Sequence, residues 1–378
     1  MENRAGNYVK QPTGYVAFIP NPLPPNPPIN FDGELIKLLS EANRELGRLD
    51  GAAEVLPNPD LFVAMYVRKE AVLSSQIEGT QASLVDLLEY ASEENNGHLP
   101  HDVGEVVNYV KAMNYGLERL DTLPLSLRLI KEIHDILLTD TRGGQMNPGE
   151  FRKTQNWIGH QGCTLKTASF VPPTVKEMQK AMYDLELYMH EENTLPLLIK
   201  VGLVHCQFET IHPFLDGNGR IGRLLITFLL CQQKVLNRPL LYLSYYFKKN
   251  RMEYYNWLME VRNKGDWEGW MKFYLRGIIE VSKQGIDTAR KIIDLQSKHR
   301  SLITNEVGTS NALKLLDLLY SMPILTITDA SKELEISYPT ANVLITKFVE
   351  IGILKEKTGQ QRNKVFSYVD YLHILEDE

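Results

Sequence analysis

Apolar residues recur every three or four positions along most of this chain of 378 residues, and that spacing predicts a mainly α-helical fold. We expect helices over residues 31–49, 59–75, 83–91, 105–120, 127–138, 174–190, 197–208 and 224–235, one that starts near 250, one over 267–279, and a longer one that ends near 299. The pattern therefore favours packed helices over a sheet-based fold.

Two stretches lack the helical spacing. Residues 1–30 are rich in proline, which cannot continue a helix, so we expect an extended arm of polyproline character. The apolar segment 15–19 precedes the prolines and predicts that the arm packs on the body. Segment 158–171 places glycines and threonines between apolar ends, which predicts a short β-hairpin.

Residues 308–378 follow another order. We expect helices over 311–320 and 339–351, a short helix that ends near 334, and strands over 352–356 and 364–368. This order resembles a winged helix-turn-helix domain. The region carries seven Lys and Arg against ten Asp and Glu, a net charge of −3, which argues against strong DNA binding. We therefore favour protein interaction or homodimer packing there, and DNA binding stays the second alternative.

Composition excludes some classes of partner. The net charge of −6 gives the whole chain no attraction to nucleic acid or to an anionic membrane. The three cysteines lack CxxC spacing, and we expect them to be reduced. A leading signal peptide and an apolar run near 18 residues are not found, so we expect a cytoplasmic protein without a membrane partner.

The densest chemistry lies in residues 212–223, HPFLDGNGRIGR. A polar loop that leads into a helix N-terminus is an anion site, because free N–H groups and the helix dipole meet there. Gly217 and Gly219 let the backbone approach a phosphate closely. Arg220 and Arg223 offer rigid forks for charge-assisted hydrogen bonds.

Other residues of the loop add reactive groups. His212 can act as a general base near neutral pH, and Asp216 is the type of hard oxygen ligand that Mg²⁺ accepts beside phosphates. Asn218 can donate to phosphate oxygens, while we expect Phe214 to anchor the loop in the core. Any one of these residues would fit a simple turn between helices, but their joint spacing favours a phosphate site.

The stretch resembles the Fic motif, His-x-Phe-x-(Asp/Glu)-Gly-Asn-Gly-Arg-x-x-Arg, and matches it at every specified position. Most proteins of this family transfer AMP from ATP to a hydroxyl of a target protein. The resemblance implies an N-terminal arm and helical region over 1–100, a Fic-type helical bundle with a short β-hairpin flap over 101–280, a connector helix over 281–307, and a winged helix over 308–378.

The resemblance also assigns roles. His212 would be the catalytic base, Asp216 would hold Mg²⁺, and ATP would be the substrate. The implied ATP-binding residues are Gly217, Asn218, Gly219, Arg220, Ile221, Gly222 and Arg223, with Tyr255 and Asn263 near the adenine. The target protein would pair with the flap near residues 158–171 by strand addition. A hairpin with a purely structural role is the alternative.

A second, shorter pattern lies upstream of the motif. Without a family, Glu78 and Gly79 indicate a helix end with glycine at the exit. Many Fic proteins carry an inhibitory motif, (Ser/Thr)-x-x-x-Glu-(Gly/Asn), which Ser74, Glu78 and Gly79 match. In the family this glutamate pairs with the second arginine of the motif, here Arg223, and blocks the seating of the ATP γ-phosphate.

Several alternatives stay open. Fic relatives phosphorylate targets, transfer phosphocholine or remove AMP, so another phosphate-containing donor is possible in principle. A transcription regulator with a nucleotide-sensing Fic core and a DNA-binding winged helix belongs to a different class, but it requires neither His212 nor Asp216. His205 lies seven residues before His212, and we expect a buried, hydrogen-bonded histidine rather than a metal ligand, because a third ligand at a fitting spacing is missing.

Overall fold

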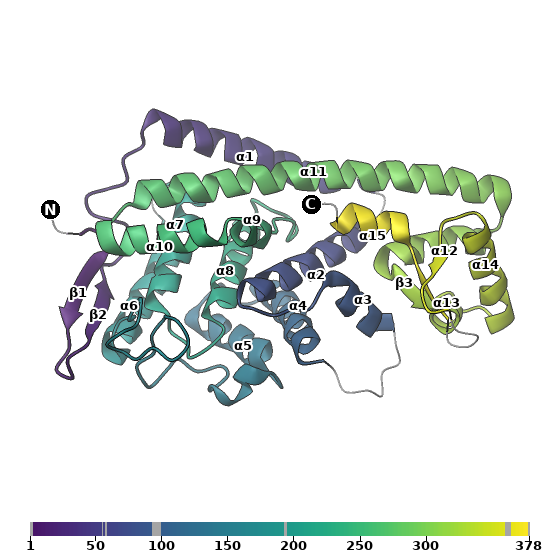
Figure 1. The fold of residues 1–378 in the computed structure, drawn as a ribbon. Helices are drawn as coiled ribbons and strands as arrows, with labels where there is room; N and C mark the ends of the chain where they lie inside the picture. Colours follow the sequence, from purple (N-terminus) through teal and green to yellow (C-terminus); the bar gives the residue numbers. More distant parts are fainter. Residues whose placement is uncertain are drawn as a thin grey trace.

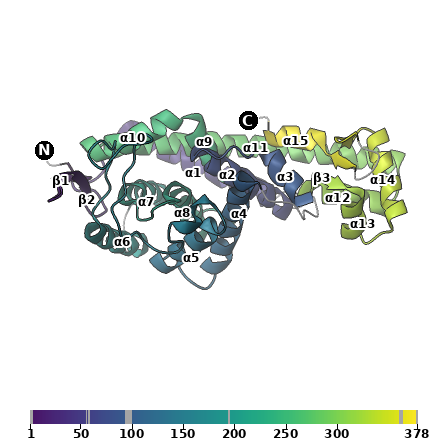
Figure 2. The same cartoon turned by 60° about the horizontal axis from the view of Figure 1, so that its bottom comes forward.

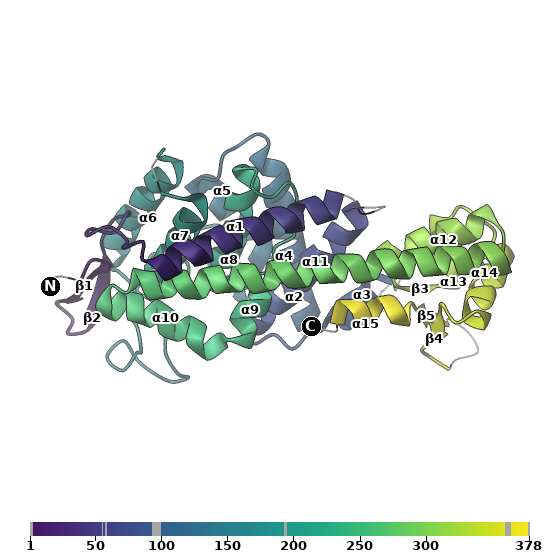
Figure 3. The ribbon, with the colours of Figure 1, turned by 90° about the horizontal axis from the view of Figure 1, so that it is seen from above.

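The computed structural model describes residues 3–54, 56, 59–92, 100–192, 195–359 and 364–376. Figure 1 shows an elongated, mainly helical molecule built along α11 (Trp267–Glu306), a helix of 40 residues. Helix α1 (Gly33–Glu54) lies beside α11, as Figure 3 shows from above. The inner face of α1 is fully buried at Leu35, Ala42 and Leu46, which follow helical spacing.

The prediction of two helices between 267 and 299 is wrong, because one uninterrupted helix spans both. Its glycines weaken the sequence pattern but serve close packing. A Cβ built on Gly285 would lie 2.8 Å from Leu49, and one on Gly277 would lie 2.6 Å from Tyr246. These glycines therefore let α11 approach its neighbours instead of ending it.

Helices on one side of α11 form the body that carries the motif. They are α2 (Pro59–Ile77), α3 (Leu84–Ser92), α4 (His101–Leu120), α5 (Leu127–Leu138), the short 3₁₀ helix η1 (Arg142–Gln145), α6 (Val175–His190), α7 (Leu197–Ile211), α8 (Asn218–Gln232), α9 (Ser244–Lys249) and α10 (Arg251–Lys264). Helices α7 and α8 are buried on almost every side and form the centre of the core. Helix α8 begins at Asn218, six residues before the apolar run that predicted it, so Arg220 and Arg223 lie on the helix rather than in the loop.

The N-terminal arm contains an antiparallel hairpin, β1 (Gly6–Lys10) and β2 (Val16–Pro20), that the proline content concealed. Phe18 is fully buried, which confirms that the arm packs on the body. The Phe18 N–H donates to the Val171 carbonyl at 2.9 Å, so β2 extends the flap.

The flap itself has less strand than predicted. Ile158 and Phe170 form one isolated antiparallel bridge, and the segment between them forms turns that are held by local backbone hydrogen bonds. Its glycines and polar residues favour turns over a ladder.

The described elements between residues 310 and 376 lie along the half of α11 that is away from β1 and β2, as Figure 2 also shows. The elements are α12 (Ser310–Ser321), β3 (Ile324–Thr326), α13 (Ile327–Glu333), α14 (Tyr338–Glu350), β4 (Lys355–Glu356), β5 (Val365–Ser367) and α15 (Val369–Glu376), with the sheet order β3-β5-β4. The order is the one expected of a winged helix, and that assignment stays a prediction. Helix α15 was not predicted, and the tip of the expected wing after Gly359 lies outside the described residues. Within the described residues, every helix is too short or too polar to cross a membrane.

Candidate active site

The motif loop joins the ends of two buried helices. Helix α7 ends at Ile211, and His212 takes a left-handed conformation with φ 50° and ψ 60°. Gly217, with φ 77°, precedes the first residue of α8. Phe214 is fully buried and stacks on the His134 ring, with centroids 3.7 Å apart, so it anchors the loop as expected.

The carbonyl groups of this loop are turned inward and bonded. The His212 carbonyl accepts from Arg152 Nε at 3.0 Å, and the Phe214 carbonyl accepts from Asn156 Nδ2 at 2.9 Å. The Asp216 carbonyl lies 3.1 Å from His134 Nε2. With its carbonyls held, the loop leaves the N–H groups of the first turn of α8 for an anion, since no side chain of the described residues caps that helix.

Asn218 has a role different from the predicted one. Its side chain is buried and bonds inside the loop, with Oδ1 accepting from the Phe214 N–H at 2.8 Å and Nδ2 donating to the Phe214 carbonyl at 2.9 Å. Only its backbone is left for a phosphate. Ile221 is a buried core residue, and Gly222 uses its carbonyl to bond His205 at 2.8 Å.

His212 is partly buried and has two cations nearby. Burial, together with the Arg262 and Arg152 cations nearby, lowers the pKa of His212 to about 4. Its Nδ1 atom has no hydrogen-bond partner among the residues that the structure describes. The imidazole is therefore neutral at pH 7, which is the form that a general base requires.

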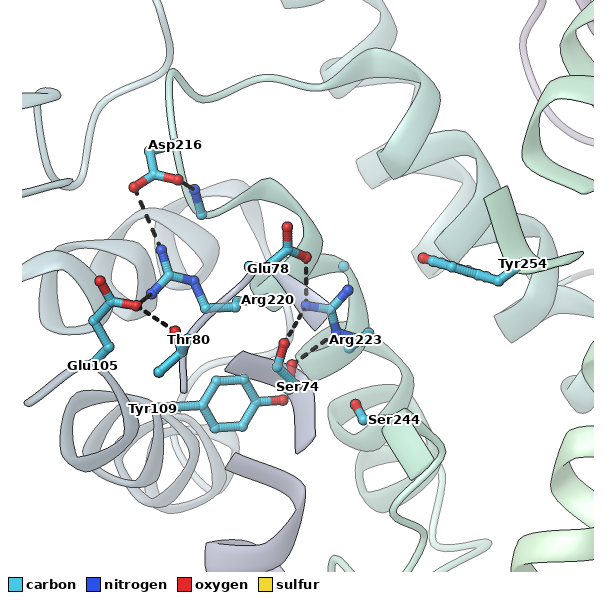
Figure 4. A network of polar contacts seen from close by, with 12 residues as sticks. Ser74, Glu78, Thr80, Glu105, Tyr109, Asp216, Arg220, Arg223, Ser244 and Tyr254 are labelled. Carbon is cyan, nitrogen blue, oxygen red and sulfur yellow. Dashed lines mark hydrogen bonds and ion pairs between the residues drawn. The ribbon is translucent and has the colours of Figure 1, made fainter. Parts of the chain in front are cut away.

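Glu78 and Arg223 form the central ion pair of the site, as Figure 4 shows. Arg223 Nη2 donates to Glu78 Oε1 at 2.7 Å and to the Ser74 carbonyl at 2.9 Å, and Nε donates to Ser74 Oγ at 2.8 Å. Burial on its own raises the pKa of the Glu78 carboxyl, but the Arg223 charge and hydrogen bond outweigh it, and that pKa is lowered. Glu78 is thus held as a carboxylate.

The Glu78 carboxylate lies against the first turn of α8. A Cβ built on Gly219 would be 2.2 Å from Glu78 Oε1 and 3.0 Å from Arg223 Nη1. Only glycine leaves room there. The carboxylate therefore sits where the helix dipole and the free N–H groups of α8 attract an anion.

Arg220 connects a second set of carboxylates. Its guanidinium lies 3.5 Å from Asp216 Oδ2 and 3.7 Å from Glu105 Oε2, and Glu105 also accepts from Thr80 Oγ1 at 2.8 Å (Figure 4). Within the described chain, Arg220 Nε and Nη1 are buried without a hydrogen-bond partner. Donors left open at this place fit phosphate oxygens.

Asp216 can take a metal ion. Its side chain is 45% exposed, and it is the hard oxygen ligand that Mg²⁺ prefers. Three or more His, Cys, Asp or Glu side chains do not cluster anywhere in the described residues, so phosphate and water oxygens would supply the other ligands.

The two predicted adenine residues differ in their placement. Tyr255 is 37% exposed, and its ring lies 5.1 Å from that of buried Tyr254. Asn263, by contrast, bonds the N-terminal hairpin, where its Oδ1 accepts from Tyr8 Oη at 2.7 Å. His205 is buried as expected and lies 2.9 Å from the Tyr254 hydroxyl. Burial lowers the pKa of His205 to about 3, so this histidine stays neutral.

Sequence reasoning missed several polar residues of the site. Glu209 is buried beside Gly222, where an added Cβ would lie 2.2 Å from its Oε1, and burial raises its pKa to about 7. Arg262 donates to the Glu209 carbonyl at 3.0 Å and lies over the Phe170 ring. The other residues missed are His134, Arg152 and Asn156. One signal was available, namely that Glu209 is the one acidic residue of α7 and lies three residues before His212.

Comparison with known proteins places these features in a family. The family model described as the Fic/DOC family N-terminal region matches residues 36–118, which include Glu78, and the Fic/DOC family model matches residues 124–230, which include the whole motif. The chain belongs to the Fic/DOC family.

Curated and solved Fic proteins extend the comparison. Proteins named protein adenylyltransferase Fic are 30% identical in Drosophila grimshawi and 29% identical in Drosophila mojavensis, each over 175 residues or 45% of this chain. The match spans 32% and 31% of those proteins, so the chain covers about a third of their length. A Fic family protein from Desulfovibrio desulfuricans G20 superposes with a TM-score of 0.56 at 19% identity, over 90% of this chain and 97% of that one. A Fic domain containing signaling protein from Bacteroides thetaiotaomicron gives 0.50 at 18% identity, over 68% and 97%. These two likenesses show the Fic fold.

Proposed function

We propose that this Fic protein is an adenylyltransferase that moves AMP from ATP to a Ser, Thr or Tyr hydroxyl of a target protein, and that Glu78 inhibits it. The single observation that carries the proposal is the position of the Glu78 carboxylate, which lies against the first turn of α8 and pairs with Arg223 at 2.7 Å. The Glu78 carboxylate thus occupies the position beside Arg223 and the N-terminus of α8 where an anion would bind. The adenylyltransferase names of the Drosophila relatives support the same chemistry.

The proposed reaction uses the neutral imidazole of His212. The imidazole takes the proton of the target hydroxyl, the hydroxyl oxygen forms a bond to the α-phosphorus of ATP, and the bond to pyrophosphate breaks. The N–H groups of Asn218 and Gly219 and the open donors of Arg220 hold phosphate oxygens. Arg223 binds the γ-phosphate once Glu78 withdraws.

Asp216 would hold Mg²⁺ in this proposal. Bound there with the nucleotide, the ion would neutralise phosphate charge. Asp216 Oδ1 accepts a hydrogen bond from the Gly217 N–H at 2.7 Å, whereas Oδ2 has only a long contact of 3.5 Å to Arg220. Oδ2 is therefore the oxygen that would be free to bind the ion.

The flap offers one free edge for the target. The backbone groups of Ile158 and Phe170 bond each other across the bridge. The Val171 carbonyl accepts from Phe18 of β2, on the edge of the 170–171 segment that faces away from Ile158. Because strand groups alternate in direction, the N–H and carbonyl groups of Trp157 and Gly159 point to the remaining edge. Trp157 is 42% exposed there. We propose that an extended segment of the target pairs along this edge.

For residues 310–376 we keep the proposal of an interaction module with winged-helix character, which also suits a homodimer. Helix α14 exposes Tyr338 by 54% and Val343 by 56%, and its only cation is Lys347. An outer face that exposes two large hydrophobic side chains and carries one cation favours contact with protein over contact with DNA phosphates.

Parallel reactions with two labelled nucleotides identify the chemistry. The Glu78→Gly variant is incubated with Mg²⁺ and ATP labelled at the α- or the γ-phosphate, with and without cell lysate. Adenylyl transfer predicts protein-bound α-label and no γ-label beyond that of lysate incubated without the variant, and chelation of Mg²⁺ should abolish the α-label. Protein-bound γ-label that depends on the variant would show phosphoryl transfer instead. An Asp216→Ala control, which removes the proposed metal ligand, should lower labelling at a given Mg²⁺ concentration.

A further inference from the structure

We propose that Arg152 is a positioning residue for His212, which it holds in the left-handed backbone conformation. This inference rests on the proposed role of His212 as the base. Arg152 is 1% exposed, and its Nε donates to the His212 carbonyl at 3.0 Å. Its backbone N–H donates to the Pro213 carbonyl at 2.9 Å, so two successive peptide groups of the motif are fixed by one residue.

The other contacts of Arg152 tie His212 to the flap. Nη1 donates to the Thr154 carbonyl at 3.2 Å, and Nη2 donates to the Pro173 carbonyl at 2.5 Å. Pro173 lies three residues after Phe170, just past the C-terminal end of the flap. One guanidinium therefore joins the base to both ends of the proposed target-docking segment.

Arg152 makes no ion pair with a carboxylate within the described chain, although it is buried. Burying a cation with carbonyl partners alone is costly, and burial lowers the pKa of Arg152 to about 10. A left-handed residue other than glycine also costs on the order of 1 kcal/mol. Two unfavourable features that meet at the reactive residue indicate a functional constraint rather than ordinary packing. The Arg152 charge also contributes to the lowered pKa of His212.

The test compares Arg152→Met and Arg152→Lys in the Glu78→Gly background. Arg152→Met should lower kcat by about 10²-fold with the Kd for ATP unchanged, because a displaced base affects only the reacting geometry. The pKa of His212, read by NMR, should rise in the Met variant and return toward its starting value in the Lys variant. Arg128→Met, at an exposed helix position, is the matched control.

Two results would overturn this role. The first is an unchanged kcat in a folded Arg152→Met variant. The second is an equal loss of stability and ATP affinity with the pKa of His212 unmoved, which would show a structural role alone. If Glu78→Gly itself does not label protein, the proposed function fails, and the NMR measurement still decides whether Arg152 controls His212.

A separate observation concerns α2, the helix that ends one residue before Glu78. Arg68 Nη1 donates to the Ser321 carbonyl at 3.1 Å, and Lys69 Nζ donates to the Leu375 carbonyl at 2.8 Å. Helix α3, which follows Glu78, is tied to the same region by an ion pair of 2.6 Å between Lys357 and Glu89. The segments on both sides of Glu78 thus rest on residues 310–376 (Figures 1 and 3).

We infer that the described part of residues 310–376 holds α2 in its inhibitory position. This second inference also rests on the proposed function. Lys69 and Glu78 are nine residues apart, which is about 13 Å along α2 and the residue that follows it. A tilt of α2 at Lys69 therefore moves the Glu78 carboxylate.

Labelling of Arg68→Met/Lys69→Met tests this inference. The double variant should incorporate several-fold more AMP than the unmodified chain and should add nothing in the Glu78→Gly background. Hydrogen exchange of the α2 amides should rise as well. Lys283→Met, which breaks an exposed pair on the α1–α11 seam, should change neither. Unchanged labelling and exchange beside a strongly labelling Glu78→Gly would refute the inference. If Glu78→Gly does not label, exchange alone decides.

Discussion

Arg223 is a buried cation whose hydrogen bonds reach only Ser74 and Glu78 within the described chain. Glu78 is the more exposed partner, with 36% of its side chain accessible. Removing it leaves a buried guanidinium short of one acceptor, at a cost of about 1–3 kcal/mol. A phosphate oxygen could replace that acceptor, and the proposed function therefore has the Glu78 carboxylate and the nucleotide compete for Arg223.

Two other buried carboxyls make stability depend on pH. Burial raises the pKa of Glu70 and of Glu209 to about 7, from 4.5 in the unfolded chain. The unfolded chain therefore loses these protons first, and stability falls as pH rises from about 4.5 to about 7. Glu70→Gln should flatten this fall by up to about 3 kcal/mol, as measured by urea unfolding at several pH values. A pH dependence identical to that of the unmodified chain would contradict the buried-acid assignment.

At the scale of elements, the start of α8 depends on glycines that admit carboxylates. Gly219 leaves room for Glu78, and Gly222 leaves room for Glu209, where an added Cβ would lie 2.2 Å from an Oε1 atom in each case. Both glycines lie in the first turns of a helix, where alanine is normally favoured. Their presence is explained by the acids that they face.

We expect alanine at Gly222 to lower the free energy of unfolding, whereas alanine at an ordinary helix glycine raises it. Gly222→Ala should lower the free energy of unfolding by about 1–3 kcal/mol, because the new methyl group meets Glu209. Gly47→Ala in α1, where an added Cβ meets nothing within 4 Å, should raise it by about 0.5–1 kcal/mol. Glu209→Ala combined with Gly222→Ala should remove most of the added loss. Equal effects of Gly222→Ala and Gly47→Ala in chemical denaturation would refute this reading.

At the scale of the whole molecule, the two ends of the chain share one core. Buried side chains of the N-terminal hairpin, the motif helices and α15 belong to a single apolar cluster that α11 runs through. Burial that continues across predicted domain boundaries favours one cooperative unit.

Thermal unfolding should therefore be one transition. The four tryptophans all lie within residues 157–270. The change in their fluorescence on heating should coincide with the loss of far-UV circular dichroism, to which residues 310–376 contribute. A later or earlier transition confined to one signal would show that the C-terminal region unfolds independently. A Leu375→Ala variant, which removes a buried contact of α15, should shift both signals together.

The sequence revealed the residues that are close along the chain and concealed those that are close only in space. Residues 212–223 are consecutive, so their chemistry could be read directly, and Glu78 was found through a second short motif. Arg152 and Glu209 look like ordinary helix or loop residues until folding buries them beside His212 and Gly222. Asn218 shows the reverse error, since its carboxamide bonds the loop and leaves only its backbone for phosphate.

Elements followed the same rule. Helices with a clear apolar stripe were predicted within a few residues, because local spacing determines them. The N-terminal hairpin was missed, since its short strands depend on contact with Val171 and the flap. The unbroken α11 was missed because Gly277 and Gly285 look like interruptions unless their packing partners are known.

The most direct measurement is incorporation of AMP from α-labelled ATP and Mg²⁺ into the unmodified chain, Glu78→Gly, and Glu78→Gly/His212→Ala. Adenylyl transfer under Glu78 control predicts strong labelling in Glu78→Gly and background labelling in the other two. Failure of all three to label while ATP still binds would contradict the transfer reaction. Equal labelling of the double variant and Glu78→Gly would contradict His212 as the base.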